Sequence, residues 1–460
     1  MIQDVEAETA RLVGAAAAND GLGGEALLDA ANAAVELAAA RQPAPASRTW
    51  LGLPWLTVEC YIPCNSSVFA PPSAQRHPSL AGLDPFRRQK DAAWGKSAGA
   101  AADMAAEVQM LLRALHSPAD HVRAADGQQG PHQQPTGGID AASATAAARL
   151  AVLAGLRIAL WGNKADLSLL AGAAGLEEHH LAAPPEVAAA VGASTAAADA
   201  ADASTVAVPA SHIIVDEGEA VWEAMASLRA RRAASVGDRG DGDGNGDGDG
   251  VRVDIVLDNS GLELFADLCL ADLLLEAGVA DRVVLHGKAI PWFVSDTLRG
   301  DLEGLLGSCE ASQPPGGQVP AAAWEPVRAL AARWRRHLAP TSAGGTGAWS
   351  WAAHSFWTTP APFAWMSELA PELYNDLSGS DLVIFKGDLN YRKLTHDCRW
   401  PHTTPFVESL QGFRPAPLVA LRTLKADVAV GLAPGLDSAL DAADADWLVD
   451  GKWGMVQAAL

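Results

Sequence analysis

Several short apolar runs in the second half of the chain end abruptly in polar side chains. Residues 255–257 are Ile-Val-Leu; Asp258 and Asn259 follow them, and a Leu- and Ala-rich helical pattern begins soon after. This order predicts a strand, a short loop and a helix N-terminus. Similar runs predict three further strands, at residues 282–286, 382–385 and 418–421. Strands that alternate with helical patterns are typical of an α/β protein, here with a doubly wound, mostly parallel sheet flanked by helices.

The first part of the chain has a different pattern. Apolar residues recur at helical spacing in residues 4–41 and 84–116, with a polar, Gly- and Pro-rich stretch after them. We therefore predict a mainly α-helical N-terminal region over residues 1–150, with a flexible loop at about 117–138. Residues 151–460 form the predicted α/β catalytic domain. Within it, residues 212–216 predict a short strand, and residues 156–161 fit either a strand or a buried helix.

Two segments of the predicted α/β domain look like insertions. Residues 238–250 are almost only Asp and Gly and lack the spacing of a calcium loop, so we expect a disordered insertion. The second is Pro/Gly-rich and lies within residues 310–348, with a helix expected at about 321–338.

Charge and cysteine content narrow the possible partners. The 460 residues include 33 Lys and Arg against 55 Asp and Glu, a net charge of -22, which opposes binding to nucleic acid or to an anionic membrane. The five cysteines form no short-spaced framework, the start of the chain is acidic, and no stretch has the apolar length of a membrane span. We expect an intracellular, cytosolic protein without a signal peptide or transmembrane segment; its oligomeric state stays open.

Three oxygen-bearing side chains follow neighbouring predicted strands. Asp258 and Asn259 follow the first, and Asp296 comes shortly after the second. Ligands bind at the carboxyl ends of strands in an open α/β sheet, and a hard divalent cation prefers oxygen ligands. The pattern therefore predicts a catalytic metal site. The alternative is that Asp258 or Asn259 caps the following helix, and that Asp296 caps a helix beginning at Thr297.

Basic side chains follow the other two predicted strands. Lys386 ends one run, and Arg422 and Lys425 follow the next. A phosphoryl group would fit between these cations and the metal site, because phosphoryl transfer mainly requires stabilisation of charge on the phosphoryl oxygens. The alternative is that the cations are surface charges or ion-pair partners of Asp388 and Asp427.

The amino-acid sequences of these segments are similar to those of a known family. Residues 253–296, residues 380–400 and the motif Arg422-Thr423-x-Lys425 resemble the metal-dependent damage-control phosphatases, in the branch also described as acidic-residue (protein-glutamate) methyltransferases. Residues 50–61, 160–168 and 451–457 look like further blocks of the family. The resemblance implies a small phosphorylated substrate and removal of phosphate, dependent on Mn²⁺, Ni²⁺ or Mg²⁺, from sugar phosphates such as fructose 1-phosphate or fructose 6-phosphate.

The resemblance implies that the catalytic metal ligands are Asp258, Asn259 and Asp296. Whether Asp258 attacks phosphorus or only holds the metal stays open. The substrate-binding residues expected from the strand ends and the resemblance are Glu59, Asn163, Lys386, Asp388, Leu389, Asn390, Tyr391, Arg392, Arg422 and Lys425.

The alternative function is a carboxyl methyltransferase that uses S-adenosylmethionine on acidic protein side chains. Glu263 matches the position that the family links with this cofactor, although no glycine-rich cofactor loop is evident. The chain also departs from the family pattern: residues 62–66 lack the expected basic residues, and His396 and Cys398 stand where Gly and a basic residue are more usual.

Overall fold

The computed structural model describes residues 84–116, 141–162, 211–238, 250–317, 319–340 and 346–460. Several sequence expectations lie outside these residues: the helical pattern at 4–41, the loop at 117–138, nearly all of the Asp/Gly-rich insertion, and the candidate pocket residues Glu59 and Asn163.

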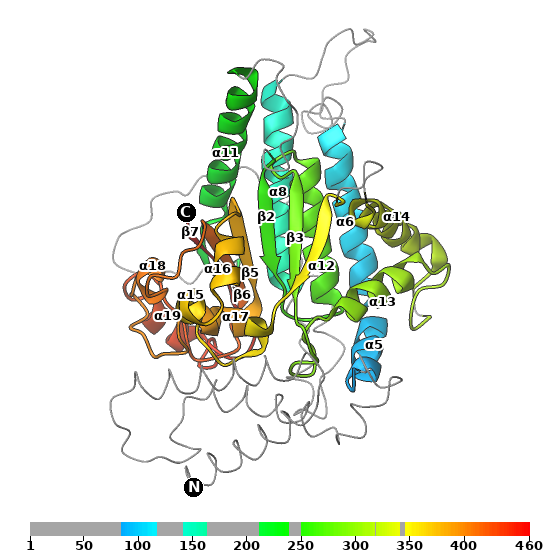
Figure 1. Ribbon diagram of the computed structural model, residues 1–460. Coiled ribbons are helices and arrows are strands. Elements are labelled where there is room, and N and C mark those ends of the chain that lie inside the picture. The colour runs from blue at the N-terminus through cyan, green and yellow to red at the C-terminus, as the bar shows by residue number, and fades with distance from the viewer. Residues whose placement is uncertain (1–83, 117–140, 163–210, 239–249, 318, 341–345) are drawn as a thin grey trace, which may run out of the picture.

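A seven-stranded sheet forms the centre of the described part of the chain (Figure 1). The strands are β1 (Ile213–Asp216), β2 (Arg252–Val256), β3 (Arg282–Gly287), β4 (Trp349–Ala353), β5 (Leu382–Lys386), β6 (Leu418–Thr423) and β7 (Gly454–Ala459). Their order is β1-β7-β6-β5-β2-β3-β4. The strands from β6 to β4 in this order pair in parallel, while β7 pairs antiparallel with β6 and parallel with β1. The predicted α/β class with a mostly parallel sheet is confirmed.

The predicted strands agree with the structure, and two strands were missed. β4 is an edge strand, Trp-Ser-Trp-Ala-Ala, most of whose residues are only partly buried. β7 contains Gly, Gln and two Ala, residues with little preference for strands. Neither segment has the continuous apolar run that marks a strand buried on both faces. Of the two alternatives for residues 156–161, the helix is correct, because they end the long helix α8 (Ala141–Trp161).

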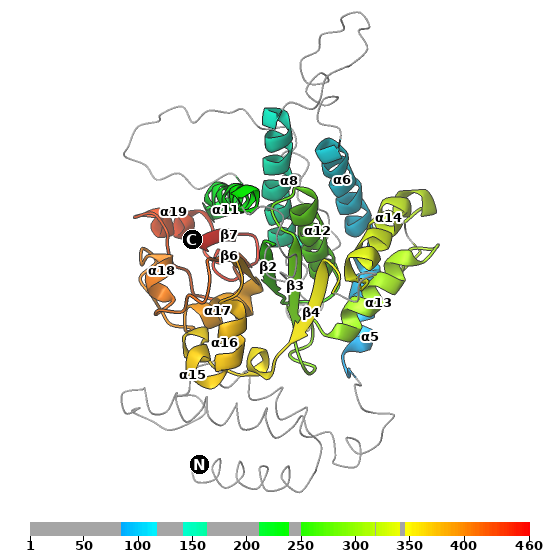
Figure 2. The ribbon, with the colours of Figure 1, turned by 45° about the horizontal axis from the view of Figure 1, so that its top comes forward.

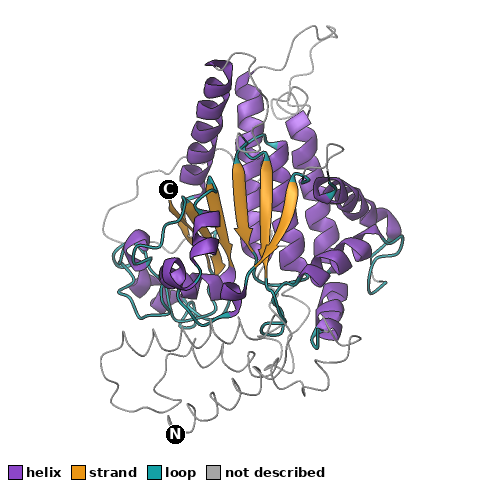
Figure 3. Cartoon of the chain, viewed as in Figure 1, coloured by secondary structure: helices purple, strands orange, loops and turns teal. Residues whose placement is uncertain are grey.

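Helices cover both faces of the sheet (Figures 1 and 2). On one face, Val253 and Ile255 of β2 join a core built with α6 (Ala98–His116), α8 and α12 (Leu262–Glu276). On the other face, Val256 of β2 and Phe385 of β5 join a second core. Successive side chains of a strand point to opposite faces, so these strands need apolar residues at nearly every position. Figure 3 shows the resulting layer of strands between layers of helices.

The other helices surround these layers. They are α5 (Arg87–Lys96), α11 (Gly218–Asp238), α13 (Arg299–Glu310), α14 (Ala321–Leu338), α15 (Met366–Leu369), α16 (Pro371–Leu377), α17 (Gly387–Leu394), α18 (Phe406–Ser409) and α19 (Leu436–Ala443), with two short 3₁₀ turns, η5 (Ser355–Thr358) and η6 (Phe363–Trp365). The predicted helix at 321–338 is confirmed as α14.

Helix α8 is the one described helix that is long and apolar enough to cross a membrane. Its residues Ala144–Trp161 have a mean hydropathy of 1.4, and 56% of them are buried inside the protein. It packs on α12, α6 and α11 and on β6 and β7. These contacts are those of a core helix. The division of the chain at residues 150 and 151 stays a prediction; residue 150 lies within α8.

Candidate functional site

Asp258 and Asn259 lie in the loop that follows β2, with 4% and 6% of their surface exposed. Helix α12 begins at Leu262, and its N-cap is Gly261, which has no side chain to cap it. Gly261 has a φ of 73°, a conformation that glycine adopts without strain. The alternative in which Asp258 or Asn259 caps this helix is therefore wrong. Both side chains are buried for another reason.

Asp296 lies directly against this loop. Asn259 and Asp296 form an antiparallel bridge, and the Thr297 N–H donates to the Asp258 carbonyl oxygen over 2.9 Å. Helix α13 begins only at Arg299, and it is Asp301, not Asp296, whose carboxylate accepts from the Leu298 N–H over 2.9 Å. The capping alternative for Asp296 is wrong as well. Adjacent strands β2 and β3 thus bring the three predicted metal ligands together.

Sequence reasoning missed Lys288 in this group. Its Nζ lies 3.1 Å from Asp296 Oδ2 and donates to the Leu257 carbonyl oxygen over 2.9 Å, and the residue is 3% exposed. Lys288 immediately follows β3, so the rule that singled out Lys386 at the end of β5 would also have found it. Lys288 thus supplies a positive charge beside the Asp296 carboxylate.

Asn259 is oriented by the two carboxylates beside it. Its Nδ2 donates to Asp258 Oδ2 over 3.1 Å and to Glu263 Oε2 over 2.9 Å. Since the amide nitrogen faces these acceptors, the amide oxygen points away from them and can serve as a ligand. Glu263, in the first turn of α12, is 2% exposed and fixes this orientation. The donor set of two carboxylates and one amide oxygen fits a hard divalent cation.

Lys386 points to the core behind this loop. Its Nζ lies 3.3 Å from Glu263 Oε1 and 3.2 Å from Asp267 Oδ1, and it is fully buried. Burial by itself lowers the pKa of Lys386, but Asp267 and Glu263 raise it overall, so the lysine is charged. Burial also raises the pKa of Asp267 well above its usual range. The ammonium of Lys386 thus balances the carboxylate that orients Asn259, and its role as a substrate contact stays a prediction.

Helix α17 begins against Asp258. Gly387, its first residue, has a φ of 84°, and a Cβ at this position would lie 1.8 Å from Asp258 Oδ2. Only glycine permits this approach. Asn390 holds the helix start in place, because its Nδ2 donates to the Lys386 carbonyl oxygen over 2.7 Å and reaches the Leu257 carbonyl oxygen at 3.4 Å. Leu389 packs in the small cluster around Trp292, in the loop that leads to Asp296.

The ends of β5 and β6 bring Asp388, Arg422 and Lys425 together. Asp388 Oδ1 accepts from Arg422 Nε over 2.7 Å and from the Lys425 backbone N–H over 3.3 Å. The fully buried Arg422 also donates to the carbonyl oxygens of Ala426 and Val428, and its guanidinium lies 4.4 Å from the centre of the Tyr391 ring. The ion-pair alternative therefore holds for Arg422 with Asp388. Asp427 instead pairs with the exposed Arg399.

Tyr391 and Arg392, the other residues of α17 predicted to contact the substrate, have hydrogen-bond partners within the protein. Tyr391 donates to Gln457 Oε1 over 2.8 Å, and burial raises its pKa to about 12, so it stays a neutral donor. Arg392 forms a bidentate ion pair with Asp397: Nε donates to Oδ1 over 2.6 Å and Nη2 to Oδ2 over 2.8 Å. These contacts fix the shape of α17 around Asp388. That any of these residues binds substrate stays a prediction.

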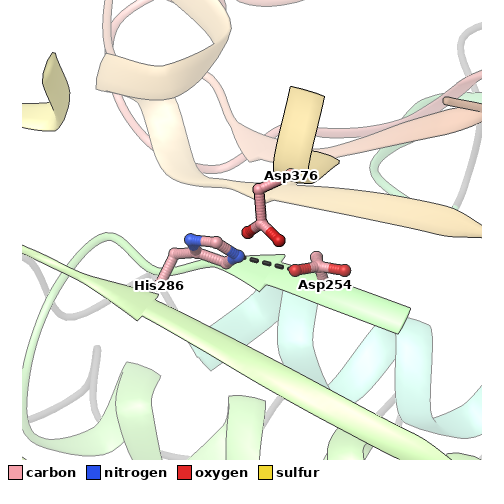
Figure 4. Close-up of side chains that lie close together, drawn as sticks. All are labelled: Asp254, His286 and Asp376. Atoms are coloured by element: carbon pink, nitrogen blue, oxygen red, sulfur yellow. Dashed lines mark hydrogen bonds and ion pairs between the residues drawn. The ribbon is translucent and has the colours of Figure 1, made fainter. Parts of the chain in front are cut away.

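Two other groups of described side chains have ligand atoms within 4.8 Å of one another. One is Asp254, His286 and Asp376 (Figure 4). Arg252 donates to both oxygens of Asp254 over 2.8 Å and pairs with Asp376 at 3.0 Å. The other is Asp272, Glu276 and His337, which Arg333 joins at 2.9 Å from Asp272 and 2.7 Å from Glu276. We interpret both as ion-pair clusters, because an arginine already neutralises the carboxylates.

Comparison with known proteins identifies the class of enzyme. Residues 15–440 match the family model of the damage-control phosphatase ARMT1-like domain. The damage-control phosphatase ARMT1 of Danio rerio is 33% identical over 410 residues, which cover 89% of this chain and 74% of the relative. The protein of the same name from Xenopus tropicalis is 32% identical over 412 residues, 89% of this chain and 75% of the relative. That of Rattus norvegicus is 38% identical over 302 residues, 66% of this chain and 57% of the relative.

The described fold is an α/β fold, with a buried acidic loop beyond the carboxyl ends of β2 and β3. The chain belongs to the ARMT1-like damage-control phosphatase family. The family and the enzyme class predicted from the sequence, a phosphatase, are confirmed, and the family supports a divalent metal and a small phosphorylated substrate.

Proposed function

We propose that this phosphatase hydrolyses sugar phosphates such as fructose 1-phosphate or fructose 6-phosphate, using Mn²⁺, Ni²⁺ or Mg²⁺. The single observation that carries the proposal is the meeting of three buried residues beside the start of α17: Asn259 bridges to Asp296, and Asp258 contacts both Asn259 and the neighbour of Asp296, Thr297. These residues follow β2 and β3, which are neighbours in the sheet, and α17 follows β5, the other neighbour of β2.

The proposed ligands of the divalent cation are Asp258, Asn259 and Asp296. When bound, the cation would supply positive charge to the oxygens of the phosphoryl group. The protein contributes the rest through its own residues: Glu263 orients the amide of Asn259, and Lys288 balances Asp296 from within the loop. Burial of these groups strengthens their electrostatic effect, because water screens them less.

The proposed substrate contacts follow β5 and β6. Lys425 is half-buried, and its backbone N–H contacts Asp388, next to the helix start that touches Asp258. We propose that Lys425 binds the phosphate and that Asp388 faces the sugar hydroxyls. Arg422 then serves to hold Asp388 and the segment from Ala426 to Val428 in place, since its donors already contact these groups.

Carboxyl methyl transfer with S-adenosylmethionine is the second candidate. Glu263, which the resemblance links with this cofactor, is buried and its carboxylate contacts Asn259 and Lys386. These contacts support a role in orienting a metal ligand, so we rank methyl transfer below phosphate release.

One experiment separates the two. The purified full chain is incubated with Mn²⁺ and a panel of sugar phosphates, with and without S-adenosylmethionine and an acidic acceptor protein, and both phosphate release and methyl incorporation are measured. We expect phosphate release that a chelator abolishes and that the methyl donor leaves unchanged. The absence of metal-dependent phosphate release from every sugar phosphate would refute the proposal, and methyl incorporation alone would favour the second candidate.

We also propose that the enzyme works in the cytosol. Cys269, Cys309 and Cys398 are free thiols, as is usual in a reducing compartment. Localisation of a tagged full-length protein tests this, and accumulation in the secretory pathway would contradict it.

A further inference from the structure

Lys90 is a buried cation on a helix that sequence reasoning did not connect with the site. It lies in α5 and is 4% exposed. Its Nζ lies 2.9 Å from Asp84 Oδ2 and 2.7 Å from Asp301 Oδ2, and it donates to the backbone carbonyl oxygen of Asp296 over 2.8 Å. A buried ammonium is costly unless it is well paired, so its position is strongly specified by these three oxygens.

The contact with Asp296 holds one particular peptide unit. The carbonyl of Asp296 accepts from Lys90, and the N–H of the same peptide, that of Thr297, donates to the Asp258 carbonyl oxygen over 2.9 Å. A peptide unit is planar, so two hydrogen bonds at its opposite ends fix its rotation. This peptide unit directly follows the Cα atom that carries the Asp296 carboxylate. Its rotation therefore affects the direction in which that carboxylate points.

Asp301 extends the same restraint to the next peptide unit, whose N–H belongs to Leu298. One of its oxygens, Oδ2, accepts from both Lys90 Nζ, at 2.7 Å, and the Leu298 N–H, at 2.9 Å. Lys90 thus restrains the main chain at Asp296 directly and at Leu298 through Asp301. Lys288 restrains the Asp296 side chain from the other end of the loop.

We infer that Lys90 is a positioning residue for the metal site: it sets the main chain of the Asp296 loop so that the Asp296 carboxylate faces Asp258 and Asn259. The inference rests on the proposed function of these three residues as metal ligands. Helix α5 thereby becomes part of the apparatus that shapes the site, although it lies more than 150 residues before β2 in the chain.

The test measures metal binding by the full chain rather than activity. Lys90→Met keeps the length of the side chain and removes its charge and donors. The dissociation constant for Mn²⁺ is measured by titration calorimetry without substrate, alongside the stability of the metal-free protein towards urea. We expect the dissociation constant to rise about 10- to 100-fold, as is usual when a residue that orients a ligand is lost.

Arg333→Met is the matched control. Arg333 also neutralises a fully buried carboxylate, that of Asp272. Asp272 lies in α12 about 14 Å along the helix axis from Glu263, because a helix rises about 1.5 Å per residue. Arg333→Met should reduce stability and leave Mn²⁺ affinity as in the wild type. If it weakened Mn²⁺ binding as much as Lys90→Met does, general loss of stability would explain both, and the inference would be wrong.

Two further variants keep the test decisive. Lys90→Arg retains a cation that can donate to Asp296 and Asp301, and we expect most of the Mn²⁺ affinity to be retained. If Lys90→Met does not fold, Asp301→Asn weakens the same restraint with little change in shape and should raise the dissociation constant. Unchanged Mn²⁺ affinity in a folded Lys90→Met or Asp301→Asn protein would overturn the inference. A wild-type protein that binds no Mn²⁺, Ni²⁺ or Mg²⁺ would instead overturn the proposed metal site itself.

Discussion

Two groups of polar side chains with buried carboxylates lie along and beyond strands β2 and β3, and their contacts differ. Within the strands, Asp254 contacts Arg252, His286 and Ser380. Just beyond the strand ends, Asp258 and Asp296 lie with Asn259 and Lys288. Both groups contain buried carboxylates: Asp254 in the first, and Asp258 and Asp296 in the second. Asp376, the other carboxylate near Asp254, is half exposed.

The two groups differ in the hydrogen-bond and ion-pair partners of their carboxylates. Both oxygens of Asp254 accept from the arginine beside it, one from His286 as well and the other from Ser380, so the first group is a closed ion-pair cluster. In the second group Lys288 contacts Asp296, and the group lies in loops at the carboxyl ends of the strands, where ligands bind in open α/β sheets. Proximity of acidic side chains alone is therefore weak evidence for a metal site, because an arginine can already neutralise the carboxylate, as Arg252 does for Asp254.

The sharpest contrast between the groups is expected in catalysis. Asp258→Ala should abolish phosphate release, a fall of roughly 10³-fold, as when a principal electrostatic group is removed from an active site. Circular dichroism should show an unchanged fold. Asp427→Ala, which removes an exposed carboxylate, is the control and should retain full activity. Wild-type turnover in Asp258→Ala would show that the assignment is wrong.

The closed group should affect stability and not chemistry. Arg252→Met leaves the fully buried Asp254 without its main partner, and we expect a loss of about 3–5 kcal/mol in the free energy of unfolding. Turnover per folded molecule should stay as in the wild type. Urea unfolding measures the free energy of unfolding. Assays of phosphate release at urea concentrations below the unfolding transition measure turnover. A large fall in turnover of the folded variant would mean that the two groups are coupled. Arg399→Met, at an exposed pair, should change neither quantity.

Glu263 tests how strongly the second group depends on its supporting residues. Glu263→Ala removes the acceptor of Asn259 Nδ2, and we expect the Mn²⁺ concentration for half-maximal activity to rise about 10- to 100-fold. Glu263→Gln keeps an acceptor and should have a smaller effect. Equal, wild-type metal dependence in both variants would contradict the orienting role of Glu263.

Lys425 should affect substrate binding more than turnover. Lys425→Ala is expected to raise KM about tenfold with little change in kcat, because the lost charge contributes similarly to the bound substrate and the transition state. Lys452→Ala, at an exposed lysine, is the matched control. A fall in kcat with unchanged KM would assign Lys425 to the chemical step instead.

The smallest effect concerns acid stability. Burial alone would raise the pKa of Asp254, but hydrogen bonds from His286 and Arg252 lower it below its ordinary value of 3.8. Since the folded-state pKa is the lower one, the stabilisation is present above pH 3.8 and is lost as the pH falls towards the folded-state value. Below pH 3.8 the free energy of unfolding should thus fall more steeply in the wild type than in Asp254→Asn. Parallel curves for the two proteins would contradict this linkage.

The family resemblance and the strand ends singled out most residues of the candidate site. Asp258, Asn259 and Asp296 were singled out because each follows an apolar run, and parallel neighbours bring such positions to one edge. Lys90 could not be found this way, because nothing in the pattern of α5 indicates which loop it contacts. The sequence also flagged His396 as a departure where glycine is more usual; its φ of 61° explains that preference.

The sequence by itself determined the strands buried on both faces, the fold class and the family, because apolar periodicity and local motifs are properties of neighbouring residues. The tertiary structure decided which partner each charged side chain has. Arg252, Lys288, Lys386 and Arg422 are all basic residues at or near strand ends, and they differ only in which carboxylates the fold brings to them. For Asp258 and Asn259, the helix cap is excluded because α12 begins later, with Gly261 as its N-cap. Their pairing with the segment of Asp296, 37 residues or more further along the chain, is one that only the sheet brings about.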